Sequence, residues 1–127
     1  MPRALTAPRR RRTTVESRRL LFQEACSIVA FEYPERLELD TLARRLATSP
    51  RQLQRAFAEI GGTSFRTLLA EVRMKRAVSL LEQGHLPVRD VALSVGYRQP
   101  AQFAKAFRRH HGAPPSNFRR PPEALAA

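Results

Sequence analysis

The sequence predicts an all-α protein of about seven helices, in two helix-turn-helix subdomains joined by a long linker helix. Apolar residues recur at helical spacing through most of the chain, and no segment alternates as a strand does. One pattern also occurs twice, at an offset of 49 to 50 residues. The first copy consists of Leu42-Ala43, Leu46, Ser49-Pro50, Leu53, Ala56-Phe57, Gly62 and Leu68. The second copy consists of Val91-Ala92, Val95, Gln99-Pro100, Phe103, Ala106-Phe107, Gly112 and Phe118.

Each copy has the local chemistry of a helix, a tight turn and a second helix. Ser49 is a favoured N-cap residue, and Pro50 and Pro100 stand where a helix needs no backbone N–H. Gly62 and Gly112 are suited to end the second helices. The second copy has one extra residue in its turn. This pattern is typical of a helix-turn-helix unit, whose second helix enters a DNA major groove.

The remaining helices are predicted from periodicity and helix-breaking residues. A first helix is expected to start at the cap Thr13, with Glu16 three residues on, and to stop before Pro34. The first helices of the two units are expected over about 40–47 and 88–95. The longest periodic segment, about 64–81, should form a stiff linker of roughly 27 Å. Pro115 can open a short terminal helix that runs through Phe118.

These elements predict five segments along the chain. We expect a disordered basic arm at 1–12, a first helix-turn-helix subdomain at 13–62, a linker helix at 63–83, a second helix-turn-helix subdomain at 84–120 and a tail at 121–127. The two recognition helices differ in their outward residues. One monomer is therefore expected to bind one asymmetric DNA site of roughly two helical turns, because only a two-fold dimer needs a palindrome.

The charge of the chain indicates an acidic partner. Its 127 residues carry 23 Lys and Arg against 11 Asp and Glu, a net charge of +12 and a pI near 11.6. A pI above about 9 is typical of nucleic-acid binding, although membrane surfaces and acidic proteins attract the same charge. No apolar stretch approaches the ~18 residues of a membrane span, and no signal peptide is evident. The single cysteine, Cys26, excludes an internal disulfide. We therefore expect a cytoplasmic, nucleoid-associated protein.

A long, ordered set of motifs matches one known family. The matching residues are Leu42-Ala43, Ser49-Pro50, Leu53-Gln54-Arg55-Ala56-Phe57, Gly62-Thr63-Ser64-Phe65, Arg73, Ala77, Leu80-Leu81, Val91-Ala92, Val95-Gly96-Tyr97, Phe103, Phe107, Gly112, Pro115, Phe118 and Arg119. Over about residues 15–120 the chain resembles the DNA-binding domain of AraC/XylS-type transcription regulators. The resemblance implies seven α-helices in two subdomains, binding to double-stranded promoter DNA, control of transcription initiation, and RNA polymerase as a partner.

The chain departs from this family at two points. Ala47-Thr48 stands in the first turn, where the family has Gly and then an apolar residue. His111 stands where the family has an aromatic residue before Gly112. Full-length members often carry a separate effector-binding and dimerisation domain, and these 127 residues hold none. The chain therefore matches a small stand-alone member or a fragment of a longer regulator, and a monomer is expected.

The residues expected to read bases lie at the start of each recognition helix. In the first unit they are Arg51, Gln52, Gln54 and Arg55, and in the second Ala101, Gln102 and Lys105. Arg suits guanine, Gln suits adenine, and Ala can touch a thymine methyl. Residues expected at the DNA backbone are Ser49, Arg98, Arg108, Arg109 and the arm residues Arg9, Arg10, Arg11 and Arg12. The plainer interpretation of all these side chains is a solvated basic surface.

Other chemistries have weaker support in the sequence. His85, His110 and His111 lack the additional ligands that a metal site needs, so no metal and no cofactor are expected. Cys26 is expected to be a core or boundary residue rather than a redox sensor. An enzyme that uses this module to find DNA, such as a repair protein, would need residues that this chain lacks, so no catalytic activity is expected. A non-specific basic protein that binds RNA or packages DNA is the third possibility, against which the differing recognition helices argue.

Overall fold

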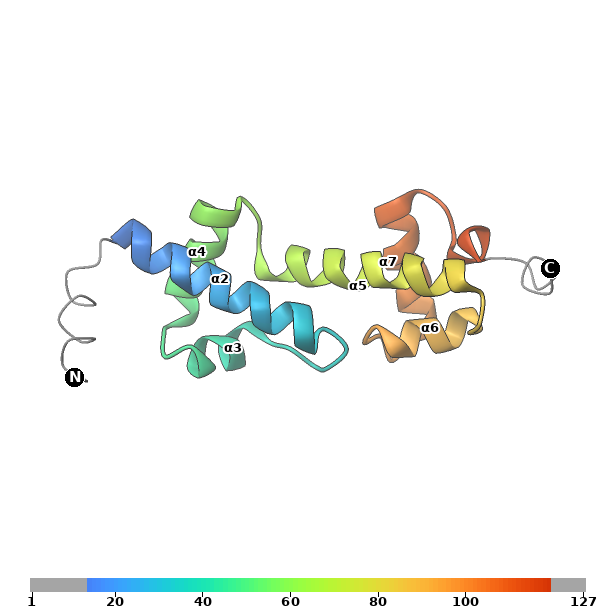
Figure 1. Cartoon of the computed structure of the whole chain (residues 1–127), viewed down its shortest axis with the longest axis horizontal. Coiled ribbons are helices and arrows are strands. Elements are labelled where there is room, and N and C mark those ends of the chain that lie inside the picture. The colour runs from blue at the N-terminus through green and yellow to red at the C-terminus, as the bar shows by residue number, and fades with distance from the viewer. Residues whose placement is uncertain (1–13, 120–127) are drawn as a thin grey trace. The chain divides into compact units, whose positions relative to one another are not determined.

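The computed structural model describes residues 14–119, which form six α-helices and one short 3-10 helix, with no strand among them (Figure 1). The elements are α2 (Thr14–Glu32), α3 (Leu39–Arg45), α4 (Pro50–Gly61), α5 (Phe65–Gln83), α6 (Val88–Ser94), α7 (Pro100–His111) and η1 (Pro115–Phe118). The all-α prediction is confirmed, and α3 and α6 end one or two residues earlier than expected. The predicted cap Thr13, the basic arm and the tail lie outside the described residues.

Contacts divide the chain into two compact units. Unit 1 comprises the residues up to Ile28 together with Glu38–Phe65. Unit 2 comprises Val29–Leu37 together with the residues from Arg66 onward. The end of α2 and the segment after it thus belong with the second helix-turn-helix motif. The division predicted from the motifs alone, at 62 and 83, follows the repeat rather than these contacts and remains a prediction.

Unit 1 packs α2, α3 and α4 around an aromatic centre. Phe57 of α4 is fully buried, and the rings of Phe22 and Phe65 meet it edge-on at centroid distances of 5.3 and 6.0 Å. Such edge-to-face pairs add to the free energy gained from burial. Gly61 permits this approach, because a Cβ there would lie 2.4 Å from Phe22 Cζ. Arg18 of α2 and Glu59 of α4 form an ion pair that also joins these two helices.

Unit 2 is built on a larger core from α5, α6 and α7. Its fully or almost fully buried members are Met74, Ala77, Leu81, Val91, Ala92, Val95, Phe103 and Phe107. Phe118 of η1 packs edge-on against Phe107 at 5.1 Å. The ring of His111 lies 4.5 Å from that of Phe107 and 5.6 Å from that of Phe118. The imidazole therefore packs in the place of the aromatic residue that the AraC/XylS-type family has at this position.

The turns of the two helix-turn-helix motifs share one backbone hydrogen-bond pattern. In unit 1, Thr48 N donates to Ala43 O at 2.9 Å, and in unit 2, Tyr97 N donates to Ala92 O at 2.9 Å. A second bond closes each turn, from Ala47 N to Arg44 O and from Gly96 N to Leu93 O, both at 3.1 Å. These bonds are those of a helix C-terminus that ends in a left-handed residue. The equivalent atoms are 49 residues apart, so the extra residue of unit 2 follows Tyr97.

The central residue of each turn has a positive φ. Gly96 has φ 105°, whereas unit 1 places Ala47 at φ 57°. The left-handed conformation costs roughly 1–2 kcal/mol for a residue that carries a Cβ. Ala47 therefore keeps the geometry of the turn at the expense of local strain. Glycine is required at position 96 for a second reason: a Cβ there would lie only 2.9 Å from both Arg73 Cζ and Tyr33 O.

The strain at Ala47 makes a testable prediction. Ala47→Gly should raise the free energy of unfolding by about 0.5–1 kcal/mol, because relief of the positive-φ strain exceeds the extra backbone entropy of glycine. Gly96→Ala is the matched reverse change and should lower it by about 1–3 kcal/mol. Denaturant titration measures both values. A destabilised Ala47→Gly protein would contradict the assignment of strain to this turn.

Candidate nucleic-acid interface

The recognition helix of unit 1, α4, is fixed at both ends and along its inner face. Ser49 Oγ accepts a hydrogen bond from Gln52 N at 3.1 Å, and Pro50 occupies the first helical position. The chain leaves the helix at Gly62, whose φ of 61° is left-handed. Leu53 and Phe57 are fully buried. The rotation of the helix is thereby set, and its polar face is turned to solvent.

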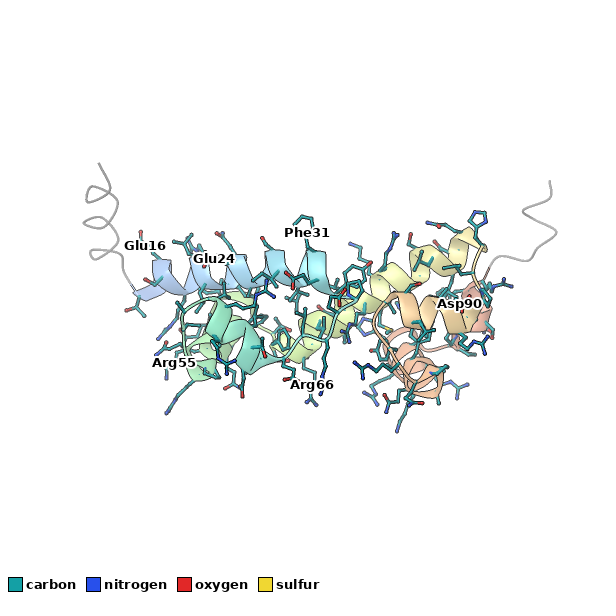
Figure 2. All side chains as sticks on the ribbon, turned by 90° about the horizontal axis from the view of Figure 1, so that it is seen from below. Glu16, Glu24, Phe31, Arg55, Arg66 and Asp90 are labelled. Carbon is teal, nitrogen blue, oxygen red and sulfur yellow. The ribbon has the colours of Figure 1, made fainter. Side chains whose placement is uncertain are left out.

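All four predicted base-reading residues of α4 are exposed. They are Arg51, Gln52, Gln54 and Arg55. Arg55 Nε lies 3.8 Å from Glu59 Oε2, with both side chains about half exposed, so this pair stabilises little and leaves donors of Arg55 available. In Figure 2, Arg55 extends from unit 1 on the side opposite to Glu16 and Glu24 of α2. Arg55 thus points away from these two carboxylates.

The recognition helix of unit 2, α7, repeats this construction with different side chains. Pro100 again opens the helix, Phe103 and Phe107 are fully buried, and Gly112 ends it with φ 78°. Its predicted base readers Ala101, Gln102 and Lys105 are exposed, as are Arg98, Arg108 and Arg109. Lys105, Arg108 and Arg109 also line a hollow of about 400 Å³ with Ala104 and Pro114. Three cations at one hollow raise the local attraction for a polyanion.

The two helices have equivalent positions at an offset of 50 residues. Gln52 and Gln102 are the same residue at the same position, and both are exposed. The positions of Arg51, Gln54 and Arg55 in α4 are taken in α7 by Ala101, Ala104 and Lys105. The first recognition helix therefore offers two forked guanidinium groups and a second amide, and the second offers a methyl group and one ammonium. The same scaffold presents two different hydrogen-bonding surfaces.

A half-buried arginine supports the turn of unit 2. Arg73 Nε donates to Tyr33 O at 2.8 Å and Arg73 Nη2 donates to Glu35 O at 2.9 Å. Its Cζ lies 5.7 Å from the ring centroid of Tyr97. Burial lowers the pKa of this guanidinium, and the facing phenol partly offsets the effect. Arg119 makes a similar contact elsewhere in unit 2, where its Nε donates to Leu86 O at 3.0 Å.

The structure brings together some residues that the sequence did not connect. Arg73 matched a family motif, but nothing in its spacing showed that it holds a segment 38 to 40 residues earlier. Arg36 was not singled out at all. The candidates Arg9, Arg10, Arg11 and Arg12 lie outside the described residues. The described chain begins at Thr14, which lines a hollow of about 230 Å³ with Thr48 and Gln52.

Among residues 14–119 no group of three or more His, Cys, Asp or Glu side chains is placed to hold a metal ion. No helix within that range is both long and apolar enough to cross a membrane. Cys26 is partly exposed on α2, and burial raises the pKa of its thiol, which disfavours the reactive thiolate.

Two helix-turn-helix units, each with an exposed polar and basic recognition helix, define a DNA-binding domain. Comparison with known proteins gives the same result, because the helix-turn-helix domain family matches residues 42–121. The HTH-type transcriptional regulator GlxA of Rhizobium meliloti is 37% identical over 91 residues, which cover 72% of this chain and 28% of that protein. This chain therefore belongs to the AraC-type family of helix-turn-helix DNA-binding domains.

Solved structures share the fold. The C-terminal domain of AraT, a response regulator from Geobacillus stearothermophilus, has a TM-score of 0.76 and 31% identity over 78% of this chain and 83% of its own. The DNA-binding domain of the global transcriptional factor AdpA, in complex with a target DNA, has a TM-score of 0.72 and 29% identity over 76% and 87%. The chain spans about a third or less of the length of the curated relatives first matched.

The pKa of Tyr97 predicts how stability depends on pH. Burial raises the pKa of this phenol above its ordinary value of 10.0, while the positive charges of Arg73 and Arg109 partly offset the effect. Folding thus favours the neutral phenol, so its contribution to stability is fully present below the unfolded pKa and is lost as pH rises through the folded pKa. As pH rises above 10, the free energy of unfolding should fall more steeply for wild type than for Tyr97→Phe. Parallel profiles for the two proteins would contradict this.

Proposed function

We propose that this chain is the DNA-reading part of a transcription regulator and that one monomer reads an asymmetric promoter site with α4 and α7. One observation carries the proposal. The same hydrogen-bonded turn is built twice, at Ala43–Thr48 and Ala92–Tyr97, but the recognition helices that follow carry different outward residues. Identical half-sites would not use that difference, so the two half-sites should differ in sequence.

The exposed residues divide into two roles. The base-reading role falls to Arg51, Gln52, Gln54 and Arg55 in α4 and to Ala101, Gln102 and Lys105 in α7. The backbone role falls to Ser49, Arg98, Arg108 and Arg109, and to the basic arm Arg9–Arg12. The hollow beside α4 supports a backbone role for the arm. Thr14, the first described residue, lines this hollow together with Gln52 of the recognition helix.

The wider biology is proposed on the same basis. A regulator of transcription initiation acts on the chromosome and on RNA polymerase, which places it in the bacterial cytoplasm with the nucleoid. We expect the chain itself to act as a monomer and without a cofactor. The short span of the match to curated relatives supports a second form of the proposal, in which these residues are the DNA-targeting fragment of a larger, effector-regulated activator. No observation favours a repair enzyme.

Selection of binding sites from a random DNA pool tests the proposal. The selected site should be asymmetric and bound by a single chain. Titration at physiological salt should give an affinity on the order of 10³-fold or more above that for random DNA. A short palindrome bound by dimers would contradict the two-helix architecture. An affinity ratio near one would contradict sequence-specific binding altogether.

Substitutions on the selected site separate the two roles. Arg51→Ala, Gln54→Ala and Arg55→Ala should each weaken binding by about 1–3 kcal/mol and relax the preference at particular bases, because each removes a base-edge contact. Deletion of Arg9–Arg12 should instead weaken binding to all sequences and flatten the salt dependence. The measurement is binding to the cognate site, to single-base variants and to random DNA. Equal losses on cognate and random DNA for the α4 variants would show that these side chains contact only phosphate.

A further inference from the structure

Unit 2 contains a hollow of about 650 Å³ next to its recognition helix. One wall is the segment 34–37, which follows α2, and the other is the turn 96–99 together with Gln102, near the start of α7. Arg73 and Leu93 complete the lining. A segment far from α7 in sequence is therefore placed beside residues already expected to touch DNA.

The charge of this hollow is positive. Its lining holds three arginines, Arg36, Arg73 and Arg98, against one acidic residue, Glu35. Arg36 and Arg98 are exposed. Leu93, a residue that is 53% exposed, adds an apolar surface to the same lining. Guanidinium groups beside an exposed apolar side chain suit a phosphodiester with its attached deoxyribose.

Arg73 holds the far wall of the hollow in place. Its hydrogen bonds to Tyr33 O and Glu35 O fix the chain immediately before Arg36. Its guanidinium also lies against Tyr97, on the opposite wall. Arg73 is partly buried and its guanidinium is already bonded within the protein, so it acts as a structural cross-link rather than an open ligand contact. The position of Arg36 relative to Arg98 thus depends on Arg73.

Unit 1 has a corresponding feature at the corresponding place. The smaller hollow beside α4 is lined by Thr48 and Gln52, which are equivalent to Tyr97 and Gln102 of unit 2. Its other wall comes from the start of α2, at Thr14 and Ser17. In unit 1 the start of α2, and in unit 2 the segment just after α2, therefore lies beside the turn and the first residues of the recognition helix.

We propose that the segment after α2 is a third DNA-contacting element of unit 2, in which Arg36 and Arg98 bind one phosphate of the DNA backbone and Arg73 positions them. This inference rests on the proposed function. A guanidinium has five donors, so Arg36 can bind a phosphate in addition to a contact that it makes within the chain. The contact fixes the protein on the backbone and carries no base preference.

Arg36→Gln tests the phosphate contact, with Lys75→Gln as its control. Both changes remove one positive charge from an exposed side chain. Lys75 follows Arg73 by two residues on α5, roughly 200° around the helix, and does not line the hollow. The slope of log affinity against log salt should fall by about 0.9 for Arg36→Gln and far less for Lys75→Gln. At 0.15 M salt this corresponds to about a fivefold loss, equal on cognate and random DNA.

Arg73→Lys tests the positioning role, because it keeps the charge and removes the forked donor. Loss of positioning predicts the same reduced salt slope as Arg36→Gln, whereas charge alone predicts no change. In the double variant Arg36→Gln, Arg73→Lys, the salt slope should fall no further than in Arg36→Gln alone, because both substitutions remove the same phosphate contact. A wild-type slope for folded Arg73→Lys would overturn the positioning role. If Arg73→Lys does not fold by circular dichroism, the comparison of Arg36→Gln with Lys75→Gln still decides the phosphate contact.

The same titrations separate this inference from the proposed function. Equal slopes for Arg36→Gln and Lys75→Gln, with wild-type protein still preferring its cognate site, would overturn the phosphate contact alone. A wild-type protein that does not distinguish cognate from random DNA would instead refute the proposed function. A reduced slope for Arg36→Gln, together with intact sequence preference, supports both.

Discussion

The hydrogen bond that closes each helix-turn-helix turn is the interaction on which the rest depends. Thr48 N to Ala43 O in unit 1 and Tyr97 N to Ala92 O in unit 2 fix the direction in which the chain leaves the first helix. The second helix can then start at Pro50 or Pro100 and pack its apolar stripe against the first. A looser turn would let α4 or α7 rotate, and the outward side chains would no longer form a defined surface.

The buried stripe converts this geometry into a hydrogen-bonding surface. Phe57 in α4 and Phe107 in α7 are fully buried, so the polar residues on the opposite face of each helix are exposed to solvent. Selection can vary those exposed positions with little cost to stability, because they make few contacts within the protein. The two units therefore have a common core geometry and different exposed residues. This separation would let one scaffold, repeated, present different surfaces to the two half-sites of the proposed DNA site.

The sequence predicted the helices well, because periodic apolar residues, proline starts and glycine ends act locally. It predicted the exposed sets of α4 and α7 for the same reason. It did not predict that Val29–Leu37 packs with unit 2, since no local pattern encodes the bonds from Arg73 to Tyr33 O and Glu35 O. It also could not show that Ala47 would keep the glycine geometry of its turn, because that balance depends on the packing around it. The contacts of Arg9–Arg12 stay a prediction.

Transfer of the outward residues of α4 to α7 tests the central claim most directly. Ala101→Arg, Ala104→Gln and Lys105→Arg together give α7 the exposed Arg, Gln, Gln, Arg set of α4, since Gln102 already matches Gln52. Sites selected from random DNA by this triple variant should contain the half-site of unit 1 twice, where the wild-type protein selects two different half-sites. A second half-site that remains as in wild type would contradict the account, because the exposed residues of α7 would then not determine what unit 2 reads.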